Sequence, residues 1–193
     1  MASRRSADLP ALLAALARAL AEAGFPYMLI GGQAVLVHGR PRLTEDIDLT
    51  LGAAPDRLAD LVAVCDSLGL VPLPPHFERF VRETFVLPCR DSATGMRVDF
   101  IFSTTPYERQ AIDRAVRVQV GGEAVRVAAA EDLILHKLFA GRARDVEDAE
   151  SVVRRKGREL DWAYLSRWAT EFSRVPGREA LPEQLARLKA QPG

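Results

Sequence analysis

Two aspartates separated by one residue could hold a metal ion in this chain. Asp46 and Asp48 fall in a strand-like segment, residues 46–51, in which alternate side chains project to the same face. Two carboxylates on one face repel each other, and a divalent cation relieves that repulsion. Mg²⁺ is usually held by one or two carboxylates together with substrate phosphates. Taken alone, so short a motif favours two exposed acids, but the features that follow favour a metal site.

A pair of glycines precedes these acids and could form an anion site. Gly31 and Gly32 lie where a short apolar strand meets a helix, and Gly32 precedes Asp46 by 14 residues. Glycine lets the backbone approach a ligand closely, and the N–H groups at a helix start point toward a bound anion. A tight turn without a ligand is the alternative, and it is the better explanation of a lone Gly-Gly pair.

A third acid, Asp99, lies within an otherwise largely apolar strand, residues 97–102. A carboxylate in a half-buried strand costs desolvation free energy unless another group pairs with it. Arg97, two residues earlier on the same face, is one candidate partner. A metal shared with Asp46 and Asp48 is the other, since three carboxylates can hold two Mg²⁺ ions about 3.5–4 Å apart for in-line phosphoryl transfer.

Hydrophobic periodicity predicts the elements that must position these residues. Strands are expected at residues 27–30, 46–51, 84–88 and 96–102, with a hairpin of residues 116–120 and 124–127. Helices are expected at residues 9–23, 31–38, 55–68, 129–140 and 143–156, with one or two more near Trp162 and Leu181. The expected fold is α+β: a mixed, twisted sheet of about four to six strands, flanked by helices and carrying the acids near one edge.

Composition sets the remaining limits. The chain has 193 residues, and its 26 basic and 26 acidic side chains leave no net charge to attract nucleic acid or an anionic membrane. We expect a catalytic core in residues 1–128 and a helical C-terminal part in residues 129–193 that closes the active-site cleft. No apolar run reaches the roughly 18 residues of a membrane span. The two cysteines lack metal-ligand spacing. We therefore expect a cytoplasmic protein with reduced, buried thiols and no membrane partner.

Together these motifs resemble the DNA-polymerase-β-like nucleotidyltransferase superfamily. Its pattern is two small residues, a short gap, Asp-x-Asp, and a third acid on a neighbouring strand. The segment RLTEDIDL, residues 42–49, is similar to the narrower group that includes AbiEii-type toxins of toxin–antitoxin pairs. That group tends to carry a helix lysine followed by an arginine and two acids, and residues 130–138 and 141–148 look like that segment. The resemblance covers about residues 25–156 and implies the nucleotidyltransferase fold.

The resemblance implies catalytic roles for five residues. Asp46 and Asp48 would be metal ligands, and Asp99 would be a third ligand or the base that deprotonates the acceptor hydroxyl. Lys137 would neutralise the charge of the triphosphate, a task suited to a compact ammonium group. Asp145 would act on the acceptor or, together with Asp148 one helical turn later, orient Lys137 or Arg42. A solvated helix face is the alternative for the helix charges, although the neighbours of Lys137 are largely apolar.

The resemblance also implies a nucleotide-binding set. Gly31, Gly32 and Gln33 would hold the β- and γ-phosphates, although many relatives have Ser or Thr where this chain has Gln33. Arg42 and Arg142 would contact phosphate or acceptor. Lys137 belongs to this set as well.

The function implied is nucleotidyl transfer dependent on Mg²⁺ or Mn²⁺. A nucleoside monophosphate would move from an NTP such as ATP to a hydroxyl of a tRNA end or a protein side chain, with release of pyrophosphate. The family alone suggests a toxin with an antitoxin protein as partner.

Three alternatives remain open. The first is transfer to an aminoglycoside-like antibiotic, which the pair Gly39–Arg40 fits and which an acid-lined acceptor cleft would favour. A basic cleft supplied by Arg42, Arg142 and Arg144 would favour tRNA instead. The second is an inactive module that binds a nucleotide or a partner protein. The third is a purely structural interaction domain whose acids are surface charge.

Overall fold

The structure is a computed structural model that describes residues 2–103 and 105–190, with side chains from Leu9 onward. The chain divides into two compact units. The first consists of Met1–Ile30 and Thr44–Ala128, and the second of Gly31–Leu43 and Ala129–Gly193. Residues 31–43, which fall within the core expected at residues 1–128, therefore group with the C-terminal helices.

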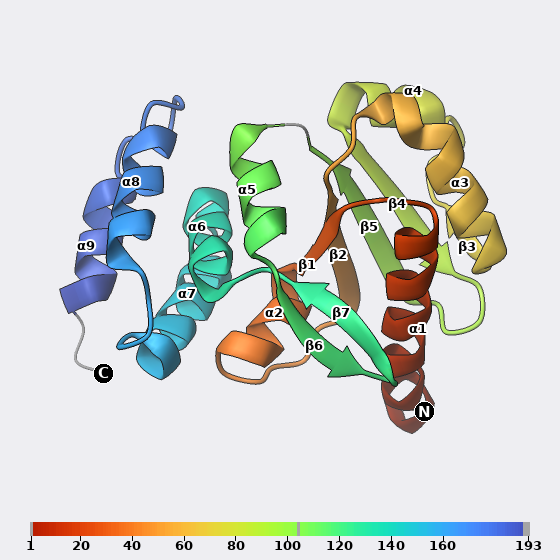
Figure 1. Cartoon of the computed structure of the whole chain (residues 1–193), viewed down its shortest axis with the longest axis horizontal. Coiled ribbons are helices and arrows are strands. Elements are labelled where there is room, and N and C mark those ends of the chain that lie inside the picture. Colours follow the sequence, from red (N-terminus) through yellow and green to blue (C-terminus); the bar gives the residue numbers. More distant parts are fainter. Residues whose placement is uncertain (1, 104, 191–193) are drawn as a thin grey trace. The chain divides into compact units, whose positions relative to one another are not determined.

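The first unit is built on one mixed sheet with the strand order β3-β4-β5-β2-β1-β7-β6 (Figure 1). The pairs β2–β5 and β1–β7 are parallel, and the other neighbours are antiparallel. The strands are β1 (Tyr27–Ile30), β2 (Asp46–Leu51), β3 (Leu70–Pro72), β4 (Val86–Asp91), β5 (Arg97–Phe102), β6 (Val116–Val120) and β7 (Glu123–Val127).

The predicted α+β class is confirmed, and two details of the prediction are corrected. The described residues form seven strands, more than the four to six expected, in part because Leu70–Pro72 adds a short edge strand. The acid-bearing strands β2 and β5 lie in the middle of the sheet. The prediction that they lie near an edge was therefore wrong, because further strands flank them on both sides.

Alternating apolar residues explain which face β2 and β5 bury. Ile47 and Leu49 in β2 and Val98 and Phe100 in β5 are at most 1% exposed. In the parallel register Ile47 lies opposite Val98 and Leu49 opposite Phe100, so these side chains form one apolar layer. Each such burial contributes about 1.5–3 kcal/mol to folding. The residues between them must then project to the opposite face.

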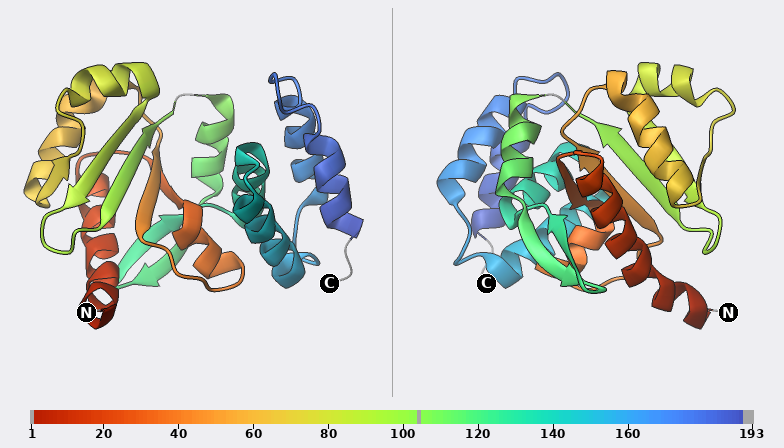
Figure 2. Two further views of the ribbon diagram at one scale, coloured as in Figure 1. Left: turned by 180° about the vertical axis from the view of Figure 1, so that it is seen from behind. Right: turned by 45° about the vertical axis from the view of Figure 1, so that its right-hand side comes forward.

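Helices of the first unit pack against this sheet. They are α1 (Ala2–Glu22), α3 (Leu58–Ser67), α4 (Phe77–Thr84) and α5 (Pro106–Arg114), and the 3₁₀ turn η1 (Pro55–Arg57) leads into α3. Helix α1 contacts β6 and β7, and the two views of Figure 2 show it beside that hairpin. Its leucine stripe, including Leu12, Leu16 and Leu20, is buried. The helix begins at Ala2, earlier than the expected residue 9.

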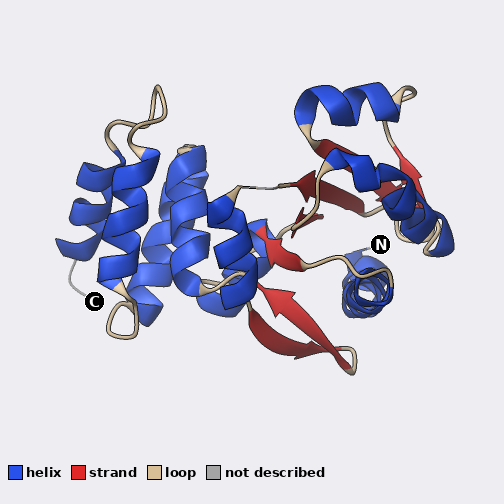
Figure 3. Cartoon of the chain, turned by 45° about the horizontal axis from the view of Figure 1, so that its top comes forward, coloured by secondary structure: helices blue, strands red, loops and turns tan. Residues whose placement is uncertain are grey.

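The second unit is made of helices and loops in its described residues (Figure 3). Its helices are α2 (Gly31–His38), α6 (Ala130–Ala140), α7 (Ala143–Lys156), α8 (Trp162–Phe172) and α9 (Leu181–Ala190). Helix α2 packs against α6 and α7, and α8 packs against α6 and α9. Gly141 ends α6 with a φ of 71°, a conformation that glycine adopts without strain, and the chain turns there into α7. In the described part of the chain, no helix is both long and apolar enough to span a membrane.

Candidate active site

The first group of candidate residues lies on one face of the sheet in the first unit. In the parallel pair β2–β5, Asp46 lies opposite Arg97 and Asp48 lies opposite Asp99. Residues paired in this way project to the same face, so three carboxylates and one guanidinium share it. Asp48 and Asp99 are partly buried, whereas Asp46 is exposed. We call this group the acidic face.

Arg97 already holds the third acid of the acidic face. Its Nε atom lies 2.8 Å from Asp99 Oδ1 and 3.0 Å from Oδ2. The hydrogen bond to Asp99 raises the pKa of Arg97, and the negative charges of Asp46 and Asp48 add to that shift. The pairing of Arg97 with Asp99, one of the two alternatives considered for this acid, is thus present.

The acidic face fits a divalent cation in its donor chemistry. Its three acids offer carboxylate oxygens, which Mg²⁺ and Mn²⁺ prefer, and they project from adjacent positions of neighbouring strands. Among the described residues, no three His, Cys, Asp or Glu side chains are already gathered as a metal site. Asp46 and Asp48 are therefore the residues that would hold the ion. Asp99 could join them by sharing its carboxylate with Arg97 or after it separates from Arg97.

The second group of candidate residues lies in the second unit, where α6 meets α7. Lys137 Nζ lies 2.8 Å from Asp145 Oδ1 and 2.9 Å from Asp148 Oδ2. Arg42 binds both carboxylate oxygens of Asp148 at 2.8 Å each, and Arg142 Nε lies 2.6 Å from Asp145 Oδ2. These five residues alternate in charge as Arg42, Asp148, Lys137, Asp145 and Arg142. We call them the charge network.

Local sequence explains how the charge network forms. Lys137 lies in the last turn of α6, and Asp145 lies in the first turn of α7, directly after the turn at Gly141. Asp148 follows Asp145 by three residues and so lies on the same side of α7. Both acids can therefore reach the lysine from one helix.

Burial makes the charge network electrostatically strong. Lys137, Asp145 and Asp148 are 7%, 2% and 4% exposed. Burial alone would raise the pKa of both carboxyl groups, but the hydrogen bonds from the neighbouring cations outweigh it. Those from Arg142 and Lys137 hold the pKa of Asp145 below its ordinary value, and those from Arg42 and Lys137 do the same for Asp148. With three cations to two anions, the network keeps one net positive charge.

The backbone conformation alone accounts for the first glycine of the Gly31–Gly32 pair. Gly31 opens α2 with a φ of 64°, so the turn from strand to helix requires glycine there with or without a ligand. Gly32 and Gln33 are buried in α2. A role for these three residues in phosphate binding stays a prediction.

Sequence reasoning missed a small polar junction between α2 and α7. The backbone N–H of Arg40 donates to Ser151 Oγ at 3.1 Å, and Arg155 donates to the carbonyl oxygen of Gly39 at 2.9 Å. The Gly39–Arg40 pair was a usable signal, since it follows α2 directly. Nothing in the sequence pointed to Ser151 as its partner.

Comparison with known proteins decides the family of the chain. The family model described as "Nucleotidyl transferase AbiEii toxin, Type IV TA system" matches residues 11–188. The chain belongs to the AbiEii family. As a member of this family it is a nucleotidyltransferase, which confirms the predicted enzyme class. A comparison with curated proteins found no match.

Solved structures support the fold of this AbiEii-family member. The solution structure of the antibiotic-resistance factor ANT(2'')-Ia has a TM-score of 0.62 and 15% identity, covering 90% of this chain and 97% of that chain. A nucleotidyltransferase-like protein from Paracoccidioides brasiliensis has a TM-score of 0.54 and 16% identity, covering 93% and 94%. At such low identity the likeness establishes the nucleotidyltransferase fold alone.

Proposed function

We propose that this AbiEii-family member transfers a nucleoside monophosphate from an NTP to a hydroxyl group, with a divalent cation, Mg²⁺ or Mn²⁺, held by Asp46 and Asp48. The observation that carries this proposal is the register of β2 and β5, which puts Asp46, Asp48 and Asp99 on one face. In the reaction the acceptor oxygen bonds to the α-phosphorus, the bond to pyrophosphate breaks, and the hydroxyl proton passes to a base. The metal supplies charge stabilisation at the reacting phosphate.

The chain's own residues have separate tasks in this proposal. Asp99 would accept the hydroxyl proton or would serve as a third ligand of the metal. Gly31, Gly32 and Gln33 bind the β- and γ-phosphates through backbone N–H groups and the amide side chain.

The charge network supplies the cations of the proposed reaction. Lys137 neutralises triphosphate charge, and Arg42 and Arg142 add further positive charge for phosphate or acceptor. Asp145 and Asp148 hold Lys137 in one position, so that little side-chain entropy is lost when the nucleotide binds.

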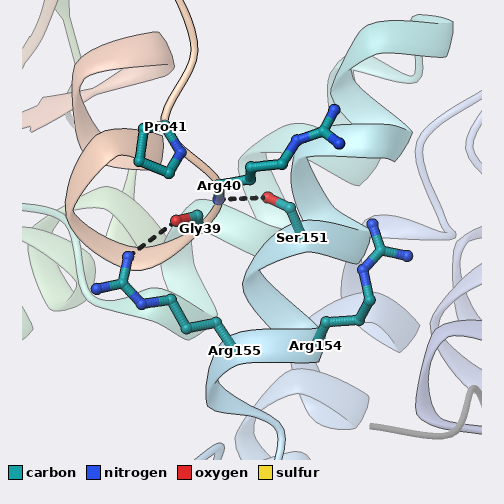
Figure 4. A pocket seen from close by; sticks show the side chains of 6 residues that line it. All are labelled: Gly39, Arg40, Pro41, Ser151, Arg154 and Arg155. Atoms are coloured by element: carbon teal, nitrogen blue, oxygen red, sulfur yellow. Dashed lines mark hydrogen bonds between the residues drawn. The ribbon is translucent and has the colours of Figure 1, made fainter.

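A basic pocket in the second unit supports a tRNA end as acceptor (Figure 4). Its volume is about 650 Å³, and its lining is Gly39, Arg40, Pro41, Ser151, Arg154 and Arg155. Figure 4 shows Arg40 and Arg154 extending on the same side, while Arg155 reaches toward Gly39. Arg154 lies 3.7 Å from Glu150 Oε2, and Arg155 donates to the carbonyl oxygen of Gly39, so part of their charge is already engaged. The three guanidinium groups still leave a net positive charge around the pocket, which suits the phosphates of a polynucleotide.

This basic pocket differs from the basic cleft expected from the sequence. Arg42 and Arg142 are ion-paired with the buried acids of the charge network, and Arg144 donates to the carbonyl oxygen of Leu43 at 3.5 Å. In this proposal Arg40, Arg154 and Arg155 add a second basic surface for the acceptor beside the positive charge of Arg42 and Arg142.

Transfer to an aminoglycoside-like acceptor is the second candidate. Its support is the fold shared with ANT(2'')-Ia, for which a complex with adenylyl-2''-tobramycin is known. The three arginines of the basic pocket would repel a polycation, which favours tRNA. An antitoxin protein as partner follows from the Type IV toxin–antitoxin description of the family.

A transfer assay tests this function. Each labelled NTP is incubated with Mg²⁺ and the chain, and with tRNA, tobramycin or a protein mixture as acceptor. We expect labelled tRNA and pyrophosphate with wild type, and a loss of at least about 100-fold with Asp48→Asn. Glu45→Gln removes an equal charge from an exposed neighbour and serves as the control. An undiminished rate in Asp48→Asn would refute the proposed reaction. If tobramycin rather than tRNA becomes labelled, the acceptor is an antibiotic and not tRNA.

A further inference from the structure

The acidic face contains a cation, Arg97, whose contact with Asp99 affects how this face can bind a metal ion. Arg97 precedes Asp99 by two residues in β5, and its Nε atom lies within 3.0 Å of both oxygens of that carboxylate. The Arg97 side chain is 46% exposed and that of Asp99 is 17% exposed. The contact is therefore partly shielded from water, while the guanidinium keeps an open route to solvent.

A guanidinium that donates to a carboxylate lowers the affinity of the same oxygens for a divalent cation, because it uses some of their lone pairs and offsets their negative charge. Both oxygens of Asp99 already accept from Arg97, so a metal that takes Asp99 as a ligand must share the carboxylate with the arginine or displace it. In register, Arg97 also lies opposite Asp46, so its positive charge stands between two of the acids that would hold the ion. A fixed positive charge this close weakens the binding of any further cation.

We propose that Arg97 competes with the divalent cation for Asp99 and thereby sets the metal affinity of the acidic face. The inference rests on the proposed function, since it takes Asp46 and Asp48 as metal ligands. Arg97 is a positioning residue in this scheme: it holds the Asp99 carboxylate while the metal is absent and releases it when the ion binds. The released side chain can turn toward solvent, because it is already half exposed.

The neighbouring strand offers a matched control. Arg90 in β4 lies directly opposite Arg97, on the same face of the sheet. Its guanidinium donates to the carbonyl oxygen of Gly95 at 2.9 Å, and among the described residues it forms no ion pair. Replacing Arg90 by methionine removes the same charge from the same face without touching Asp99. The pair of variants therefore separates competition for Asp99 from a general change in surface charge.

The experiment measures Mn²⁺ binding to the full chain by electron paramagnetic resonance, without nucleotide. The variants are wild type, Arg97→Met, Arg97→Lys, Arg90→Met and Asp48→Asn. We expect Arg97→Met to bind Mn²⁺ about tenfold more tightly than wild type, Arg90→Met to stay within about twofold, and Arg97→Lys to lie close to wild type. Circular dichroism confirms that each variant is folded.

The possible outcomes separate the two proposals. If wild type binds Mn²⁺, Asp48→Asn weakens that binding and Arg97→Met leaves it unchanged or weaker, the competition is refuted while the metal site stands. If Arg90→Met tightens binding as much as Arg97→Met, general surface charge accounts for the effect and the competition is refuted. If neither wild type nor Arg97→Met binds Mn²⁺, both the metal site and the competition fail.

Discussion

At the scale of single residues, Lys137 is the member of the charge network whose removal should affect function more than stability. If Lys137 becomes methionine, Asp148 keeps both hydrogen bonds to Arg42, and Asp145 keeps Arg142. We expect the free energy of unfolding to fall by only about 1–2 kcal/mol, because no buried carboxylate loses all its partners. Nucleotidyl transfer should fall at least about 100-fold.

Chemical denaturation and the transfer assay measure the two effects of Lys137→Met. Asp148→Asn is the comparison variant, since it leaves Arg42 without its acid. We expect a larger loss for Asp148→Asn, about 3 kcal/mol or more, as is typical when one partner of a buried pair is removed. An equal loss of stability in both variants would show that Lys137 is chiefly a structural residue.

The lowered pKa values of Asp145 and Asp148 predict how this stability depends on pH. A carboxyl group whose pKa is lower in the folded chain stabilises the fold above its unfolded pKa, which is ordinarily 3.8. That contribution is lost as the pH falls through the lower, folded pKa. The difference in unfolding free energy between wild type and Lys137→Met should therefore be constant near neutral pH. It should shrink as the pH falls below 3.8. Urea denaturation across that range measures it, and a difference that widens in acid would contradict the cause given for the pKa shifts.

At the scale of elements, the contact of α2 with α7 depends on the absence of a side chain at Gly39. A Cβ atom there would overlap the Ser151 hydroxyl and lie 3.1 Å from Val152 Cγ2. The hydroxyl cannot rotate away without giving up its hydrogen bonds with the Arg40 N–H and the Asp148 carbonyl oxygen. We expect Gly39→Ala to lower the free energy of unfolding by about 1–3 kcal/mol.

A double-mutant cycle with Ser151→Ala tests this cause. Ser151→Ala removes the overlapping oxygen and should itself cost about 1 kcal/mol for the lost hydrogen bonds. The double variant should then lose less stability than the sum of the single variants, by at least about 0.5 kcal/mol. Additive losses would mean that Gly39 is needed for another reason.

Elements with strong local signals could be predicted from the sequence. Strand β2 reads as a strict alternation, and β1, β2, α2 and α7 have the bounds expected from the sequence. Helix α4 was missed because it has eight residues and a single buried one, Val81. Thr84 and Phe85 were expected in a strand. In the structure Thr84 ends α4 and Phe85 has a left-handed φ of 61°, which is rare outside glycine and leaves no sequence signal.

The candidate site likewise has one part that the sequence could predict, the acidic face, and one that it could predict only in part, the charge network. The acids of the acidic face could be found because strand periodicity fixes which side chains share a face, and the fold places Asp48 opposite Asp99. The charge network was anticipated in part. Spacing predicted that Asp145 and Asp148 share a side of α7 and could orient Lys137 or Arg42, but not that both acids would contact Lys137 while Asp148 also binds Arg42. Contacts between helices depend on how the turn at Gly141 directs the chain, and periodicity carries no information on that.

At the scale of the whole molecule, the proposed residues are distributed over both compact units, so ligand binding is best followed by the melting of the entire chain. A ligand that binds only the folded state raises the melting temperature, by an amount that grows with its concentration relative to Kd. We expect one NTP with Mg²⁺ to raise the midpoint by several degrees at about 100 times Kd, where the gain is about 2.7 kcal/mol. The NTP without Mg²⁺ should have a smaller effect.

The double variant Asp46→Ala/Asp48→Ala is the control that tests whether the ligand binds at the acidic face. Removing two like charges from one face relieves repulsion, so the variant should remain folded without ligand. It should nevertheless lose the Mg²⁺-dependent shift, because the carboxylates that would hold the ion are gone. A shift that persists in this variant would place the nucleotide elsewhere on the molecule. If no NTP shifts wild type, the acids are surface charge, and the alternative of an interaction module gains support.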